Sequence, residues 1–579
     1  MGQQIHARTL CEAFQETVAE RGDHPALRTK GDATRITWRE YGDRVRRYAG
    51  GLAGLGVKAH DAVAILLINR PEMNLVDMAA VHLGAVPFSM YVTSTVDQIK
   101  HLLADSEANV IVTEKLLLPK AQAAAGGRTI ICVDNGDLEK LETPTGFDFD
   151  AGWRAVTEDH LLTIIYTSGT TGAPKGVEIT HANMMEELRA FQSIRMVGGD
   201  ARSISYLPHA HIADRMGQHY LHIVSGATVT ACPDPRQLFE HVADVHPTDF
   251  TGMPRVWEKL KAGLEAKFAA ESPAQQAMIK GALDAGHMRV KLEQAGQPIP
   301  EPLAAGCARA EAALFAPIRN AIGFDQTRSY FVGAAPTPRD VLEFFHAINV
   351  PIAEVWGMSE LSCVATSNPI GRAKIGSVGQ ALPGIDLKIA NDGEILVRGP
   401  IVMRGYRNMP EQTKETIVDG WLHTGDIGEL DGEGFLKIVD RKKELIINAN
   451  GKNMSPANIE ATIKGSSPLI GQACVIGDAK PFNVALLVLD PDGAMAFSRA
   501  HGIDQPLAKL VEHPALVAAV EAAIAKANDA LSRVEQIKRW KILPDEWLPA
   551  GDELTPTMKL RRKPIAQKYA AQIAALYVP

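Results

Sequence analysis

A stretch that could bind phosphate lies between residues 166 and 181, where the sequence is YTSGTTGAPKGVEITH. It follows an apolar run at 161–165 and combines glycines, hydroxyls and one lysine. Such Gly-rich loops gather backbone N–H groups into concave sites that attract anions. The spacing differs from the common P-loop, because this lysine follows a proline and precedes a glycine. By itself the stretch leaves two interpretations open, a phosphate-binding loop and a flexible polar turn.

Four further stretches with chemically versatile residues follow in order along the chain. They are VGAAPTP (332–338), EVWGMSE (354–360), DGWLHTGDIGELDGEGFLKIVDRKK (419–443) and LTPTMKLRRK (554–563). Together with the stretch 166–181 they resemble the adenylate-forming superfamily, which comprises acyl-CoA synthetases, luciferases and peptide-synthetase adenylation domains. The resemblance is closest to long-chain fatty acyl-CoA synthetases of the bubblegum and bacterial kinds. It runs from about residue 40 to residue 563.

The resemblance implies a ligase that makes acyl-CoA in two steps. The carboxylate of a fatty acid attacks the α-phosphate of ATP, which gives acyl-AMP and pyrophosphate, and the thiol of coenzyme A then displaces AMP. The first step brings two anions together, so it needs cations, a metal ion and oriented N–H donors. ATP, Mg²⁺ and coenzyme A are therefore the implied cofactors and co-substrates, with a fatty acid as the substrate.

The opening loop is implied to hold the β- and γ-phosphates of ATP. The residues concerned are Thr167, Ser168, Gly169, Thr170, Thr171, Gly172 and Lys175. Lys175 supplies a point charge, whereas Thr170 and Glu360 match the magnesium positions of the family. One hydroxyl and one carboxylate, completed by phosphate oxygens, form a suitable shell for Mg²⁺.

Residues between 333 and 441 are implied to hold the adenosine part of the nucleotide. Trp356 matches an aromatic ring that lies against adenine, with a buried core tryptophan as the competing interpretation. Asp426 matches the carboxylate that holds the ribose hydroxyls, and Arg441 matches a second ribose contact. Glu354 stands where many members have Gln or Asn near the adenine amine. The other implied nucleotide contacts are Gly333, Ala334, Ala335, Val355, Gly357 and Ser359.

Two lysines in the C-terminal part of the chain are implied to make the two steps occur in different orientations of a small lobe. Lys559 matches the lysine that reaches the α-phosphate and carboxylate oxygens, and a solvated basic tail is the alternative. Lys443 matches the hinge about which a small lobe turns after adenylation. That rotation would withdraw Lys559 and bring the loop around Gly451 to the pantetheine channel. This chain has Asn450 before Gly451, where many members have paired glycines.

The acyl pocket is implied by three residues. Gly357 is small where acetate-using relatives carry a tryptophan, which leaves room for a long chain. His211 matches a histidine beside the acyl carboxylate. Trp257 matches a gate of the fatty-acid tunnel, with packing in the core as an equal alternative. The histidines of segment 209–222 also suggest a zinc site, although no cysteine lies nearby and their spacing is a weak signal.

Two other functions remain open at this point. A fatty acyl-AMP ligase would load a carrier protein instead of coenzyme A, but no extra restraining segment is evident near 350–375. A nucleotide-binding sensor or scaffold would bind ATP without turnover. The presence of Lys559, Glu360 and Thr170 together argues against the scaffold.

The hydrophobic pattern predicts the elements that must position these residues. Short apolar runs alternate with segments of helical spacing, which predicts parallel sheets covered by helices. The runs are 62–68, 109–114, 162–168 and 351–357, and the helical segments include 38–55 and 181–195. The Ala-rich segment 258–320 predicts a helical insertion, and the Gly-punctuated segment 376–440 predicts short antiparallel strands.

The expected fold class is α/β with two domains. A large N-terminal domain of layered α/β sheets with a small β-barrel-like part covers residues 1–440. A small, mobile α+β C-terminal domain covers residues 441–579 and is joined to it by a hinge. At 579 residues the chain is too long for one core, which agrees with this division.

Composition limits the partners. The net charge of −8 leaves no broad basic surface for a nucleic acid. The six cysteines lack CxxC spacing and favour reduced thiols in the cytoplasm. The N-terminus lacks a signal-peptide profile, and the longest apolar runs are too short to span a bilayer. Contact with the inner face of a membrane and a homodimer are both left open.

Overall fold

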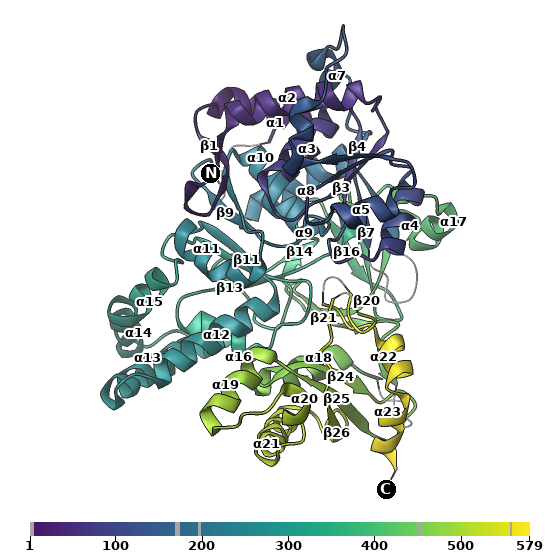
Figure 1. Cartoon of the computed structure of the whole chain (residues 1–579). Coiled ribbons are helices and arrows are strands. Elements are labelled where there is room, and N and C mark those ends of the chain that lie inside the picture. The colour runs from purple at the N-terminus through teal and green to yellow at the C-terminus, as the bar shows by residue number, and fades with distance from the viewer. Residues whose placement is uncertain are drawn as a thin grey trace.

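The computed structural model describes residues 5–167, 174–194, 198–447, 453–549, 551–555 and 558–578. The chain forms a large N-terminal domain and a small C-terminal domain, drawn in green to yellow below the large one in Figure 1. The buried clusters of the large domain use residues between Ala7 and Leu436, and those of the small domain use residues between Ile446 and Tyr569. The predicted boundary at 440/441 falls in the gap between these two sets.

Mostly parallel sheets build the large domain, as the alternating pattern predicts. One has the order β4-β3-β5-β6, a second has β2-β1-β10-β9, and a third has β11-β12-β13-β14-β15. The bounds are β1 Pro25–Thr29, β2 Arg35–Thr37, β3 Ala62–Leu66, β4 Val86–Ser89, β5 Val110–Thr113, β6 Thr129–Cys132, β9 Arg202–Ser205, β10 Thr228–Ala231, β11 Asp249–Gly252, β12 Ser329–Val332, β13 Ile352–Trp356, β14 Thr366–Ser367 and β15 Gln380–Ala381. The strands predicted around 62–68, 109–114 and 351–357 are thus confirmed.

Antiparallel strands carry the candidate loops. Strands β7 (Leu161–Thr167) and β8 (Lys175–Thr180) form a hairpin around the phosphate-loop candidate, and β18 (Gly405–Tyr406) pairs with β8. A second antiparallel sheet centres on the long strand β20, which pairs with β17, β19 and β21. In the described part of the chain this sheet has the open order β16-β17-β20-β19, without a closed barrel. Its bounds are β16 Asp386–Ile389, β17 Glu394–Arg398, β19 Ile417–Val418, β20 Trp421–Leu430 and β21 Leu436–Arg441.

Four helices of the large domain begin at capping boxes. Thr9, Thr37, Thr95 and Ser272 each form a capping box with the Glu or Gln three residues on. The bounds are α1 Leu10–Arg21, α2 Trp38–Gly54, α3 Pro71–His82, α4 Val96–Ser106, α5 Leu118–Ala125, α6 Asp137–Lys140, α7 Phe149–Arg154, α8 His181–Ile194, α9 Ile212–Asp214, the π-helix Arg215–Tyr220, α10 Leu221–Ser225, α11 Leu238–Val245, α16 Arg339–Ala347 and α17 Pro410–Thr416. The helices predicted at 38–55 and 181–195 are confirmed.

Segment 258–320 is helical, as its alanine-rich pattern predicts. It contains most of α12 Pro254–Ala269, then α13 Pro273–Gln294, α14 Glu301–Ala310, the π-helix Glu311–Phe315 and all but the last residue of α15 Ala316–Ala321. Within the described ranges no helix is both long and apolar enough to cross a membrane.

The small domain has an α+β architecture. A sheet of order β24-β25-β26 is flanked by helices, and a short β22–β23 hairpin precedes it. The bounds are β22 Ile446–Ile447, β23 Asn453–Met454, α18 Pro456–Ser466, β24 Ile470–Ile476, β25 Asn483–Leu489, α19 Pro491–His501, α20 Leu507–Leu510, α21 Pro514–Ala530, β26 Ile537–Leu543, α22 Arg562–Lys568 and α23 Ala570–Tyr577.

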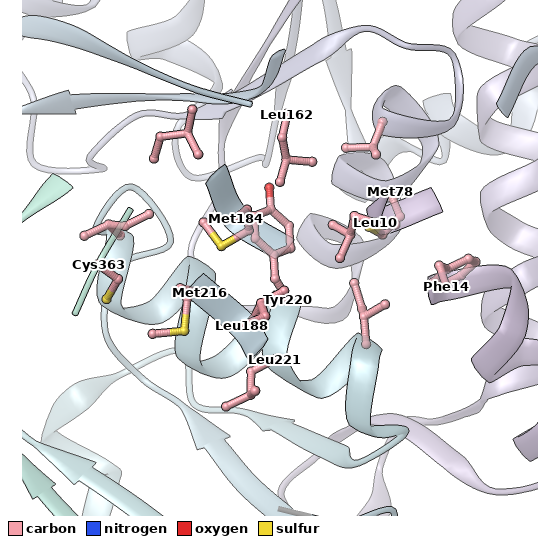
Figure 2. Packing of buried hydrophobic residues seen from close by; sticks show 14 of the residues in the cluster. Leu10, Phe14, Met78, Leu162, Met184, Leu188, Met216, Tyr220, Leu221 and Cys363 are labelled. Atoms are coloured by element: carbon pink, nitrogen blue, oxygen red, sulfur yellow. The ribbon is translucent and has the colours of Figure 1, made fainter. Parts of the chain in front are cut away.

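The main core reaches the turn that carries the candidate magnesium ligand. Figure 2 shows Met184 and Leu188 of α8 near Met216 of the π-helix and Cys363 of the turn after β13. All four side chains are buried. Close packing against α8 and the π-helix therefore holds the turn that follows the EVWGMSE stretch.

Candidate active site

Strands β20 and β21 bring three predicted nucleotide contacts together, at a site that we call the nucleotide corner. Asp426 and Arg441 are register partners, and Arg441 Nε lies 2.7 Å from Asp426 Oδ1. The indole Nε1 of Trp356, at the end of β13, donates to Asp426 Oδ2 at 2.9 Å. Trp356 and Asp426 are 8% and 5% exposed. One buried carboxylate on β20 thus links the end of β21 to the end of β13, which belongs to a different sheet.

Glu360 lies in a single 3₁₀ turn, Ser359–Leu361, a few residues beyond Trp356. The hydroxyl of Tyr406 donates to Glu360 Oε1 at 2.8 Å, and the backbone N–H of Met403 donates to the carbonyl of Glu360 at 2.9 Å. Burial, followed by the charge of Glu360, raises the pKa of Tyr406. The Lys175 ammonium lies 4.8 Å from the centre of the Tyr406 ring. Tyr406 therefore connects the end of the phosphate-loop candidate to the magnesium candidate.

Lys559 is presented by a tight turn of the small domain. Leu554 and Leu560 form a β-bridge, Lys559 N donates to Thr555 Oγ1 at 3.0 Å, and Met558 adopts a left-handed φ of 63°. The side chain contacts solvent, yet the protein around it lowers its pKa, first by desolvation and then through the charge of Arg441. Asp426 and Glu360 act on Lys559 in the opposite direction. The small domain thus brings its lysine within electrostatic reach of the nucleotide corner.

His211 lies within reach of the same lysine. Burial lowers the pKa of His211 to about 4, and Lys559 is the second cause. Its Nδ1 accepts the backbone N–H of Ala213 at 3.2 Å. The imidazole is therefore neutral at pH 7 and carries its proton on Nε2, which makes Nε2 a hydrogen-bond donor.

Glu354 on β13 is a partly exposed carboxylic acid. Its Oε2 accepts the backbone N–H of Gly376 at 3.0 Å. Burial raises the pKa of Glu354 to about 7. The group is consequently divided between its neutral and ionised forms near neutral pH.

Two glycines of the candidate site are required by close contacts between chain segments. A Cβ on Gly357 would lie 1.9 Å from the carbonyl oxygen of Cys363, and one on Gly333 would lie 2.8 Å from Val355 Cγ2. Ala334 follows with a left-handed φ of 71°. Close packing against Cys363 therefore requires a glycine at position 357, in addition to any room that its small size leaves for an acyl chain.

Trp257 lies in the second hydrophobic core, where the structure agrees with the core interpretation. The residue is 0% exposed, and its indole N–H donates to the carbonyl of Phe331 at 3.3 Å. Its ring centre lies 5.0 Å from that of Phe345 and 5.4 Å from that of Phe250. To act as a tunnel gate, the side chain would have to leave this aromatic cluster.

The zinc interpretation of segment 209–222 is not supported. Throughout the described residues, no group of three His, Cys, Asp or Glu side chains is arranged to hold a metal ion. His219 instead pairs with Asp77, which also pairs with Arg215, and the Asp77 and Arg215 side chains are fully buried. His209 Nδ1 lies 2.7 Å from Asp214 Oδ2. Buried charges such as those of Asp77 and Arg215 require partners of this kind, so His209 and His219 have structural roles.

Part of the predicted site lies outside the described residues. Ser168, Gly169, Thr170, Thr171, Gly172 and Gly451 belong to those segments. The ends of the phosphate-loop candidate are described, and Thr167 and Lys175 are register partners on β7 and β8. Lys443 is exposed between β21 and β22, at the passage into the small domain.

Two family models match this chain along most of its length. The model of the AMP-binding enzyme matches residues 14–407, and that of the AMP-binding enzyme C-terminal domain matches residues 443–579. The chain belongs to the AMP-binding enzyme family. The second match begins close to Lys443, where the core of the large domain has ended.

Several relatives of this AMP-binding enzyme carry the names of fatty-acid–CoA ligases. The protein named putative fatty-acid–CoA ligase fadD11 in Mycobacterium tuberculosis is 49% identical over 76% of this chain and 78% of its own. The long-chain-fatty-acid–CoA ligase FadD15 of Mycobacterium bovis is 34% identical over 94% of this chain and 92% of its own. The long-chain-fatty-acid–CoA ligase ACSBG2 of Gallus gallus is 32% identical over 98% of this chain and 81% of its own.

Solved structures of other AMP-binding enzymes share the fold. The o-succinylbenzoate CoA synthetase MenE of Bacillus subtilis, in complex with its acyl-adenylate, has a TM-score of 0.70 and 22% identity, covering 95% of this chain and 97% of its own. The anthranilate CoA ligase AuaEII, in complex with anthranoyl-AMP, has a TM-score of 0.72 and 17% identity, covering 98% of each chain. These likenesses confirm the predicted fold class, a large N-terminal and a small C-terminal domain.

Two residues that contribute to the site of this AMP-binding enzyme escaped the sequence analysis. Tyr406 binds Glu360, and the buried Glu187 of α8 accepts the backbone N–H of Val364 at 2.8 Å. Both lie outside the recognised stretches, and their partners are 46 and 177 residues away. No local pattern in a single sequence signals such contacts.

Proposed function

We propose that this chain is an ATP-dependent long-chain fatty acid–CoA ligase. It is an AMP-forming enzyme: the fatty acid and ATP give acyl-AMP and pyrophosphate, and coenzyme A then displaces AMP to form a C–S bond. ATP, Mg²⁺ and coenzyme A are its cofactors and co-substrates. The observation that carries the assignment of roles is the position of Lys559, within electrostatic reach of Asp426, Glu360, Arg441 and His211.

Asp426 is proposed to accept hydrogen bonds from the ribose hydroxyls. A carboxylate offers about four lone-pair positions, and Trp356 and Arg441 engage one on each oxygen. The remaining positions are free for a diol, and the two protein contacts fix the orientation of the acceptor. Trp356 is proposed to lie against adenine while its N–H holds Asp426.

Lys559 and His211 are proposed to act on the reacting groups. The Lys559 ammonium would neutralise the α-phosphate and carboxylate oxygens as they approach, where an oriented charge is most effective. The Nε2–H of His211 would donate to the acyl carboxylate and fix its attacking oxygen. Because this imidazole is neutral at pH 7, it orients the substrate without adding a second cation.

The donor set around Glu360 fits a magnesium ion bound together with ATP. Its carboxylate is held by Tyr406, and oxygen ligands are those that Mg²⁺ prefers. When bound, the ion would neutralise phosphate charge during pyrophosphate departure. Thr170, the second proposed ligand, lies outside the described residues.

The proposal is tested with acids from C2 to C26, ATP and coenzyme A, followed by release of AMP. Long-chain acids are expected to give AMP, pyrophosphate and the CoA thioester. Formation of ADP and phosphate as the only nucleotide products would reject the assignment. Replacing free coenzyme A with a phosphopantetheinyl carrier protein tests the acyl-AMP ligase alternative, which the relatives do not favour.

We also propose a cytoplasmic location, because all six cysteines are free and are not paired as disulfides. Contact with the inner face of a membrane and a homodimer are further proposals. Flotation with anionic vesicles tests the first, and sedimentation equilibrium tests the second.

A further inference from the structure

Two ion pairs connect the domains away from the nucleotide corner. Arg255 on α12 of the large domain pairs with Asp490, and Lys259 Nζ lies 2.9 Å from Asp492 Oδ2. Asp490 and Asp492 stand at the start of α19 in the small domain. Helices α12 and α19 lie next to one another where the domains meet (Figure 1). We call these four residues the clasp.

Each of the two helices that carry the clasp is anchored in its own domain. Arg255 and Lys259 are four residues apart and so project from the same face of α12. Trp257 lies between them in sequence but is buried in the aromatic cluster of the large domain. On the other side, Asp490 Oδ1 caps α19 by accepting the N–H of Gly493 at 2.9 Å, while Oδ2 pairs with Arg255.

Beside the clasp, α18 of the small domain lies in close contact with the start of α16 of the large domain. A Cβ on Gly465 of α18 would lie 3.1 Å from Pro338 Cβ and 3.4 Å from Asp340 Oδ1, at the start of α16. Lys261 of α12 pairs with the same Asp340 at 2.5 Å. Helices α12 and α16 therefore form one surface, against which α18 and α19 of the small domain rest.

We propose that Arg255 and Lys259 are positioning residues for the first half-reaction. Through Asp490 and Asp492 they hold the small domain in the orientation that brings Lys559 to Asp426 and Glu360. This inference rests on the proposed function, in which the small domain changes orientation before the thioester is formed. The clasp opens at that change, so it favours adenylation over thioester formation.

The exposure of the pairs suits a contact that must open in every cycle. The side chains of Lys259 and Asp492 are 47% and 72% exposed, and those of Arg255 and Asp490 are 36% and 12% exposed. Pairs in contact with solvent are weak and are screened by salt. They bias an orientation without locking it.

A charge swap tests the proposal on the full-length protein. The variants are Lys259→Glu, Asp492→Lys and the two combined, and Lys267→Glu, on the exposed last turn of α12, is the matched control. One readout is fatty-acid-dependent ATP–pyrophosphate exchange, and the other is single-turnover transfer of preformed acyl-adenylate to coenzyme A. We expect each single variant to lower exchange by about two- to fivefold, with most of the rate restored in the swap.

Two further measurements distinguish a positioning role of the clasp from a general effect on protein stability. They are the rate of transfer to coenzyme A and the salt dependence of ATP–pyrophosphate exchange. Transfer to coenzyme A should be unchanged or faster in the single variants, and their exchange defect should shrink as ionic strength rises. Arg255→Gln provides a second, independent variant should one of the others fail to fold, and it should show the same pattern.

Two results would overturn the proposal that the clasp positions the small domain. One is exchange equal to that of the unmodified protein in every variant. The other is an equal fall in both half-reactions that the swap does not restore. Absence of exchange in the unmodified protein would instead reject the proposed function.

Discussion

Asp426 and Arg441 face each other across the β20–β21 ladder, and their side chains form an ion pair of 2.7 Å. Trp356 completes the arrangement from another sheet by donating its indole N–H to the same carboxylate. The carboxylate is nearly buried, whereas the arginine is about half exposed. Much of the proposed nucleotide affinity therefore depends on one side chain whose two partners are already in place.

Removal of Asp426 should weaken ATP binding. Asp426→Ala would remove the proposed ribose acceptor and leave Arg441 and the Trp356 N–H without it. We expect the Kd for ATP, measured by calorimetry, to rise roughly 30-fold, which corresponds to about 2 kcal/mol. Asp426→Asn keeps an acceptor for the indole and should lose less. Unchanged affinity in Asp426→Ala would contradict the ribose assignment.

Lys559 should be needed for adenylation but not for transfer to coenzyme A. Lys559→Ala is expected to lower pyrophosphate exchange about 10²- to 10³-fold, since an oriented charge at the reacting phosphate is lost. ATP binding and transfer from preformed acyl-adenylate should persist. Lys563→Ala, which removes an exposed lysine from the same basic run, is the control. Equal losses in the two variants would favour the solvated-tail interpretation.

Glu354 should make the stability of the ligand-free protein depend on pH. Burial raises its pKa from 4.5 to about 7. Between these values the unfolded carboxyl has lost its proton while the folded one retains it, so stability falls as pH rises through this window. Glu354→Gln should therefore raise Tm relative to the unmodified protein more at pH 8 than at pH 5. The exposed Glu429→Gln should show no such difference, and a Glu354→Gln effect of equal size at both pH values would refute this.

Trp257 should affect stability more than chain-length preference. Trp257→Ala would empty a site surrounded by aromatic rings and should destabilise the large domain by about 3–5 kcal/mol. Trp257→Phe keeps most of the packing and should cost about 1–2 kcal/mol. Denaturant unfolding measures both, and the acid panel should give the same optimum for Trp257→Phe. A shifted optimum at near-normal stability would instead support a gate.

The secondary structure was largely accessible from the sequence. The run at 62–68 and the helical spacing at 38–55 match β3 and α2 within two residues. Local rules suffice there, because side-chain period and helix caps act over a few residues. The partners of the polar side chains in segment 209–222 could not be predicted from the sequence, for the opposite reason. The partner of Arg215 and His219 is Asp77, more than 130 residues away.

Sequence alone supplied the family resemblance, the proposed reaction and most of the candidate residues. Their chemistry depends on side-chain type and short spacing, and both are visible in the linear chain. Only the tertiary structure placed Tyr406 on Glu360, Trp257 in the core and Arg255 against Asp490, 235 residues away. Such contacts are set by how packed domains meet, and no local propensity of either partner encodes the distance between them.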